Sequence, residues 1–125
     1  MTKIRVVWTV SYEGVADESV ANTVDLEFEK MGLYMLMLEG QVRLENVNKE
    51  SLMLRVDSGC DYDVCTENGR YMRSLQFNGE PITGPIEKPF GLGDELVIQD
   101  SIVGMDEERF PGTYTTQKIV RLVQE

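Results

Sequence analysis

Hydrophobic and polar residues alternate one by one near the start of this chain. From residue 3 to residue 13 every second side chain is apolar, and the side chains between them are polar with the single exception of Val7. Side chains of a β-strand point alternately to the two faces of a sheet, so this period of two predicts a long strand with one apolar face. That face consists of Ile4, Val6, Trp8, Val10 and Tyr12.

Six further segments are predicted to be strands, because they alternate in the same way or are rich in β-branched residues. They are residues 24–29, 33–44, 52–57, 70–77, 95–103 and 113–123. Gly40 predicts a bulge or bend within the second of these segments. The strands are separated by turn residues, namely a loop with Gly14 and Asn22, the hairpin dipeptide Asn78-Gly79, and an irregular connection over residues 81–93.

About seven strands, separated by turn signals and with almost no helical periodicity, predict an all-β fold, an immunoglobulin-like β-sandwich. The 125 residues fit a single domain, residues 1–125. In the last segment we expect Tyr114, Val120 and Leu122 to supply apolar surface. Two adjacent apolar pairs, 119–120 and 122–123, leave open which face of that strand is buried.

The chain is acidic, with 22 acidic and 12 basic residues and a formal net charge of −10. Phosphate backbones and anionic lipid surfaces repel such a protein, so neither nucleic acid nor a membrane is expected as a partner. The longest apolar run, residues 33–38, is far shorter than the roughly 20 residues that span a bilayer. The first residues do not form a secretory signal peptide, so we expect a chain that is either made without secretion or given in its mature form.

Histidine is absent, which removes the commonest general base and the commonest metal ligand. Nothing in the sequence combines a nucleophile, a base and an oxyanion site, so neither enzyme activity nor a cofactor is expected. Residues 91–94, Gly-Leu-Gly-Asp, lack the lysine and helix of a phosphate loop and predict a turn. The acidic residues Asp57, Asp61, Asp63 and Glu67 lack the full calcium-loop pattern, so they predict a solvated acidic loop rather than a metal site.

The chain has two cysteines, Cys60 and Cys65, which lie close together in an acidic, turn-like stretch. An even pair in a small β domain can form a local disulfide, which would contribute about 2 kcal/mol to stability. Two free thiols in a reducing compartment are the alternative, because spacing alone does not show that the sulfur atoms meet.

Four segments, in their order along the chain, resemble the major pilins of the alpha-type chaperone-usher family, which includes the colonisation-factor and cable pili. Residues 3–10, KIRVVWTV, resemble the donor strand of this family, and residues 48–56, NKESLMLRV, resemble its mid-domain strand. Residues 75–83, LQFNGEPIT, are similar to its strand-turn segment. Residues 111–114, PGTY, open a C-terminal strand much as Gly-x-Tyr does in pilins.

The resemblance implies a structural subunit of an extracellular filament, a fimbrium or pilus, which acts in cell adhesion as a homopolymer. A pilin domain lacks one strand, and the N-terminal strand of a neighbouring copy fills the groove by β-augmentation. Residues 1–13 would be this donor strand, and its partners would be copies of the chain or another assembly subunit. Exposed loops would contact a host-surface receptor. The alternative is that the strand pairs within its own chain.

Two other functions fit the same sequence. A virion structural protein, such as a capsid decoration or tail subunit, is also a β-sandwich and needs no signal peptide. An acidic inhibitor that occupies a basic enzyme site is the second, and its binding would weaken steeply with salt.

Overall fold

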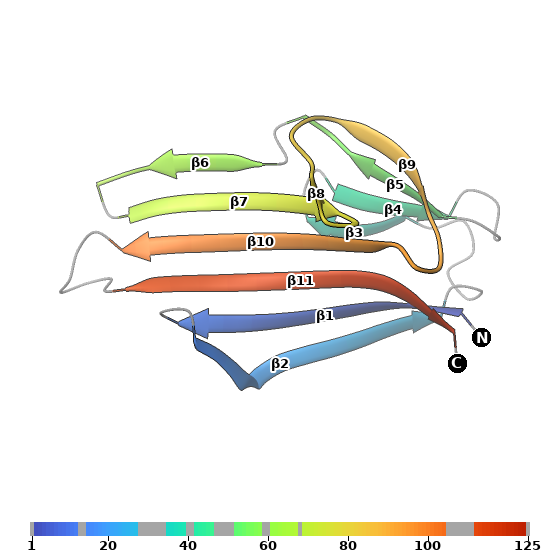
Figure 1. Ribbon diagram of the computed structural model, residues 1–125, viewed down its shortest axis with the longest axis horizontal. Helices are drawn as coiled ribbons and strands as arrows, with labels where there is room; N and C mark the ends of the chain where they lie inside the picture. Colours follow the sequence, from blue (N-terminus) through green and yellow to red (C-terminus); the bar gives the residue numbers. More distant parts are fainter. Residues whose placement is uncertain are drawn as a thin grey trace.

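The computed structural model describes residues 2–12, 15–27, 35–39, 42–46, 52–58, 61–67, 69–104 and 112–124. These residues form eleven β-strands in two antiparallel sheets that pack as a sandwich (Figure 1). The described part of the chain contains no helix that is long and apolar enough to cross a membrane. The predicted all-β sandwich is therefore confirmed, but with eleven strands rather than about seven.

The larger sheet has seven strands, six of which follow the order β2-β1-β11-β10-β7-β6, while β8 pairs with the end of β7. The strand β1 lies between β2 and β11 and pairs with both along most of its length. The bounds are β1 (Thr2–Tyr12), β2 (Val15–Glu27), β6 (Tyr62–Cys65), β7 (Gly69–Phe77), β8 (Glu80–Pro81), β10 (Glu95–Gly104) and β11 (Thr113–Gln124).

The smaller sheet has four strands in the order β3-β4-β5-β9. Each of them is short, and β4 and β5 are the two central strands. The bounds are β3 (Met35–Glu39), β4 (Val42–Asn46), β5 (Leu52–Val56) and β9 (Ile86–Phe90).

The core lies between the smaller sheet and one end of the larger sheet. The period of two in the sequence explains it, since alternate residues of each strand face the opposing sheet. In β5, for example, Leu52, Leu54 and Val56 are buried while the two residues between them are half-buried. The buried apolar residues are Ile4, Val6, Val42, Leu44, Leu52, Leu54, Val56, Leu75, Ile82, Phe90, Leu96, Ile98 and Val120.

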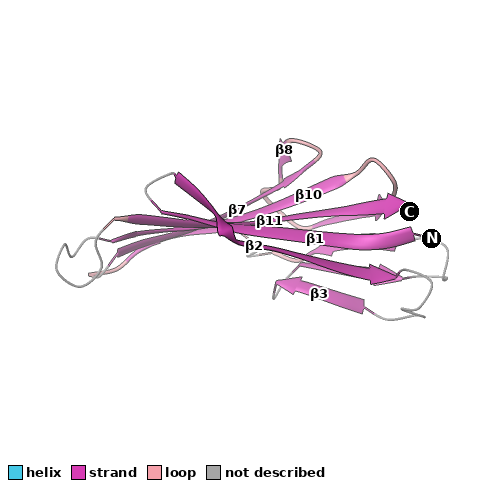
Figure 2. Cartoon of the chain, turned by 90° about the horizontal axis from the view of Figure 1, so that it is seen from below, coloured by secondary structure: helices cyan, strands magenta, loops and turns pink. Residues whose placement is uncertain are grey.

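The other end of the larger sheet extends well beyond the smaller sheet (Figures 1 and 2). We call this part the projecting end and define it as residues 9–12, 15–17, 62–65, 69–73, 100–104 and 112–116. None of the buried apolar residues belongs to it. The described strands of the smaller sheet therefore cover only part of the larger one.

Several of the predicted strands agree with the structure. Residues 2–12, 52–56, 69–77, 95–104 and 113–124 form strands close to the predicted bounds. The hairpin at Asn78-Gly79 is also confirmed, because both residues have positive φ angles, 52° and 84°, as a type I′ turn requires.

Other predictions were wrong. Asn22 lies within β2 and not in a loop. The register of β2 against β1 shifts between Trp8 and Val10, so that residues 18–21 lie opposite Thr9. This bulge interrupts the alternation by which the sequence would have identified the strand. The segment predicted as one bent strand forms two strands, β3 and β4, which pair as neighbours. Gly40, where the bend was predicted, lies outside the described residues.

Two strands fall in stretches that were predicted to be irregular. The turn-like region around the cysteines contains β6, which pairs with β7. The proline-rich connection over residues 81–93 contains β9, which pairs with β5. Pro89 is compatible with β9 because this strand lies at the edge of its sheet, where a missing N–H group breaks no ladder.

Replacing Leu54 by Ala tests the position of the core. Leu54 is fully buried in the central strand β5, so Leu54→Ala is expected to lower the free energy of unfolding by about 2 to 5 kcal/mol. Leu92 is 58% exposed, and Leu92→Ala is expected to change it by less than about 0.5 kcal/mol. Urea unfolding of both variants measures the difference, and equal losses would contradict this core.

Candidate functional site

The predicted donor strand, β1, is a central strand of its own chain. Its register partners run from Gln124 to Tyr114 on β11 and from Glu27 to Val15 on β2. Ile4 and Val6 are buried in the core, whereas Val10 lies on the projecting end and is half-buried. Exchange of this strand into a neighbouring copy stays a prediction, and it requires β1 to leave both partners.

Trp8 and Tyr12 follow Ile4 and Val6 at alternate positions of the same strand. Trp8 pairs with Lys118, and Tyr12 pairs with Tyr114. The side chains of Trp8 and Tyr12 lie outside the described part of the structure.

The predicted apolar residues of β11 lie on one face but in different surroundings. Val120 is fully buried, and Leu122 packs against the core. Tyr114 lies on the projecting end and is 37% exposed. The structure thereby resolves the register that the sequence left open, because the face with Val120 is directed toward the smaller sheet.

Cys65 is a free and exposed thiol in β6. Cys60 lies outside the described residues, so the disulfide between the two cysteines stays a prediction. Residues 62–65 are extended along β7.

The predicted acidic loop is partly a strand, and two of its carboxylates form ion pairs. Asp63 lies in β6 and accepts hydrogen bonds from Nε and Nη2 of Arg70, at 2.8 and 2.5 Å. These bonds lower the pKa of Asp63 below its ordinary value. Asp57 accepts a bond of 2.7 Å from Nη1 of Arg43. Among the described residues, no group of three or more carboxylates or thiols is placed to hold a metal ion.

Residues 91–94 form a turn, as predicted. The carboxylate of Asp94 accepts a hydrogen bond of 2.8 Å from the Gly91 N–H, and Gly93 has a φ angle of 91°. This bond and the one from the Asp94 N–H to the Gly91 carbonyl, at 3.1 Å, hold the turn between β9 and β10.

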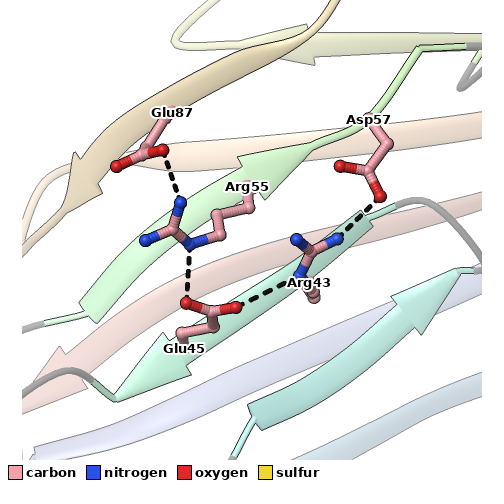
Figure 3. Close-up of polar contacts among 5 residues, drawn as sticks. All are labelled: Arg43, Glu45, Arg55, Asp57 and Glu87. Carbon is pink, nitrogen blue, oxygen red and sulfur yellow. Dashed lines mark hydrogen bonds and ion pairs between the residues drawn. The ribbon is translucent and has the colours of Figure 1, made fainter.

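An ion-pair chain that the sequence did not predict crosses the outer face of the smaller sheet (Figure 3). Glu45 lies between two arginines on β4 and β5, accepting from Arg43 Nε at 3.2 Å and from Arg55 Nε at 2.6 Å. Arg55 also binds Glu87 of β9, and Arg43 binds Asp57. The register explains the contacts, because Arg43 is opposite Arg55, which is opposite Glu87.

The chain of ion pairs stabilises the charged forms of Glu45, Arg43 and Arg55. The hydrogen bond from Arg55 is the main cause that lowers the pKa of Glu45, and the bond from Arg43 adds to it. The pKa of Arg43 is raised mainly by Asp57, and that of Arg55 mainly by Glu45. Glu45, held ionised in this way, is a poor proton donor near neutral pH.

On the projecting end, a charged pair borders the core. Arg73 binds Asp100 through Nε at 2.6 Å and through Nη2 at 3.1 Å, and its guanidinium lies over the Tyr62 ring at 5.2 Å. The Arg73 and Asp100 side chains are only 15% and 27% exposed. This bidentate pair ends the apolar interior of the sandwich.

Beyond this pair, the same face of the sheet becomes apolar again. Val64, Tyr71, Ile102 and Tyr114 are consecutive register partners on β6, β7, β10 and β11, so their side chains share one face. Tyr12 and Val15 continue this line of partners on β1 and β2. We call these six residues the transverse row.

The opposite, outer face of the larger sheet carries uncharged side chains over a wide area. Three successive lines of register partners across β1, β11, β10 and β7 contain no charged residue. Their polar members bond to one another, for example Gln117 Nε2 to Gln99 Oε1 at 3.4 Å and Ser101 to Thr115 at 3.3 Å. The lines are Val7, Ile119, Val97 and Gln76, then Thr9, Gln117, Gln99 and Ser74, then Ser11, Thr115, Ser101 and Met72.

The pockets among the described residues are open to the surface. One of about 630 Å³ lies beside β6 and is lined by Asp61, Tyr62, Asp63, Met72, Arg73, Ser74, Gln99 and Ser101. The residues that line it include two serines and two aspartates but no histidine or lysine.

Replacing Glu45 by Gln tests the ion-pair chain. The pKa of Glu45 is lower in the folded state than in the unfolded state, where it is about 4.3. The ionised Glu45 therefore stabilises the fold at pH values above about 4.3. This contribution is lost as the pH falls through the lower folded-state pKa. Glu45→Gln is therefore expected to be less stable than wild type at pH 7, with a difference that shrinks at acid pH. Urea midpoints across this range measure it, with Glu80→Gln as the control, and a difference independent of pH would contradict it.

The thiol of Cys65 is expected to react with a maleimide in the native, unreduced protein, because it is free and exposed. Peptide mass spectrometry locates the label, and Cys65→Ser is expected to remove it. Full protection of the native protein, abolished by a reductant, would instead support the bridge to Cys60.

Comparisons with known proteins find no match for this chain, either among protein families, among curated proteins or among solved structures. The resemblance to pilins therefore stays a prediction.

Proposed function

We propose that this chain is a non-enzymatic structural subunit that is built into a larger assembly. The observation that supports this most is the projecting end, which the described strands of the smaller sheet leave uncovered on both faces. A sheet in a compact domain normally covers at least one face with another layer. A neighbouring molecule would supply that layer for a subunit of an assembly.

The chemistry of the described side chains supports a role without catalysis. The sequence has no histidine, and the carboxylates Glu45, Asp63 and Asp100 are bound to arginines. Such pairs consume the charges that a reaction would use, while they hold the sheets together. This supports a structural role over an enzymatic one.

The proposal has two forms, a fimbrial pilin and a virion subunit. The pilin form works by donor-strand exchange, which would remove β1 from eleven register positions on β11 as well as from β2. The virion form, a capsid decoration or tail subunit, leaves β1 in place and uses the surface of the folded domain. The intrachain pairing of β1 supports assembly through the surface of the folded domain. A fimbrial pilin would be extracellular, whereas a capsid decoration or tail subunit would lie within a virion.

Fractionation of the native source tests the proposal. Filaments or particles are separated by density-gradient centrifugation, and the chain is quantified by mass spectrometry. We expect many copies of the chain in one high-mass fraction. Recovery as a free monomer would contradict the proposal, and recovery as a complex with one basic enzyme that dissociates in high salt would favour the inhibitor instead.

A further inference from the structure

The exposed apolar side chains of the described residues gather on one face of the projecting end. Four large hydrophobic residues are exposed, with Tyr62 at 41%, Val64 at 49%, Leu92 at 58% and Tyr114 at 37%. All of them except Leu92 lie on the face of the larger sheet that also carries Leu75 and Val120 in the core. Exposed apolar groups that cluster in this way mark interaction surfaces, whereas scattered ones do not.

This face is separate from the domain's own core. The Arg73–Asp100 pair lies between the core and the transverse row, so the row does not extend the interior of the sandwich. Tyr71 and Ile102, in the middle of the row, are half-buried. From β6 to β11 the row is therefore an apolar strip that lacks an opposing layer from the described strands.

Charge favours a second copy of the chain as the occupant. Two molecules with a formal charge of −10 each repel one another, so they can approach closely only through a surface without net charge. The described side chains of the row are uncharged. In the line of register partners beside it, Arg73 and Asp100 neutralise each other, and Asp17 lies at the β2 end of that line. A basic partner would instead be attracted to the acidic surface elsewhere.

The size of the strip predicts a weak contact. Six strands about 4.8 Å apart and about five residues of 3.3 Å give a footprint of about 400 Å² on each copy, or about 800 Å² in total. Stable dimers bury about 1,200 to 2,000 Å², so a single contact of this kind is expected to be weak and to gain strength by repetition in an assembly.

We propose that the face of the projecting end that carries Val64, Tyr71, Ile102 and Tyr114 is the surface through which two copies of this chain pack, sheet against sheet. The same face on both copies makes the contact two-fold symmetric. This inference rests on the proposed function, since it names the partner and the surface that the assembly uses.

Sedimentation equilibrium of the full chain, from about 1 μM to 1 mM, tests the inference with the variants Tyr114→Glu and Val64→Glu. Wild type is expected to form a weak dimer that strengthens between low and high salt, because salt screens the repulsion between the acidic copies. Each variant is expected to weaken the dimer at least about tenfold. The control, Leu92→Glu, adds the same charge at an exposed apolar site in the turn between β9 and β10, and is expected to leave the dimer unchanged.

Circular dichroism verifies that each variant folds, and Tyr114→Ser replaces Tyr114→Glu if the latter unfolds. A wild type that stays monomeric over the whole range, or variants that weaken the dimer no more than Leu92→Glu does, would overturn the inference. Either result leaves the proposed function to be judged by the native fractionation alone. Conversely, a dimer in solution together with a monomer in the native source would uphold this surface and reject the assembly.

Discussion

The structure depends on burial of apolar side chains between two sheets of unequal extent. Among the described residues, Leu44, Leu54 and Val56 of the smaller sheet and Ile4, Leu96 and Val120 of the larger one belong to one buried cluster, from which water is excluded. Where the smaller sheet ends, the strands of the larger sheet continue with their backbone hydrogen bonds intact. The strands of the larger sheet are thus hydrogen-bonded over a greater length than the part that is buried in the core. The projecting end is the part that is hydrogen-bonded but not buried in the core.

Charged groups are arranged around this limit. The chain of ion pairs from Asp57 to Glu87 covers the outer face of the smaller sheet, and the Arg73–Asp100 pair closes the core on the inner face of the larger one. The exposed pairs among them, such as Arg43–Asp57, contribute little stability individually. Away from these pairs, the transverse row and three lines of register partners on the outer face of the larger sheet contain no charged residue.

The sequence was sufficient to predict the fold class and five of the strands, because in those strands a period of two or a richness in β-branched residues dominates, despite exceptions such as Val7. It failed at β2, where residues 18–21 interrupt the alternation, and at β9, where Pro85 and Pro89 resemble a connection. It also grouped Val10 with Ile4 and Val6, although they differ in burial. Alternation assigns a residue to a face of a sheet, but it contains no information on how far the opposing sheet extends along that face.

The ion pairs could not be predicted for a related reason. Arg43, Arg55 and Glu87 meet because three strands are aligned in one register, and that register depends on hairpins and connections that no local pattern specifies. Cys65 shows the same limit, since its environment depends on the pairing of β6 with β7.

The position of β1 between β2 and β11 has a consequence for how the chain folds. Thr2 is opposite Gln124, so the pairing that joins the two halves of the larger sheet closes a loop of almost the whole described sequence. During synthesis on the ribosome, β1 and β2 can form a hairpin early, but one edge of β1 must wait until β11 has been made. Contacts between residues so distant in sequence slow folding, and the waiting edge is open to pairing with other chains in the meantime.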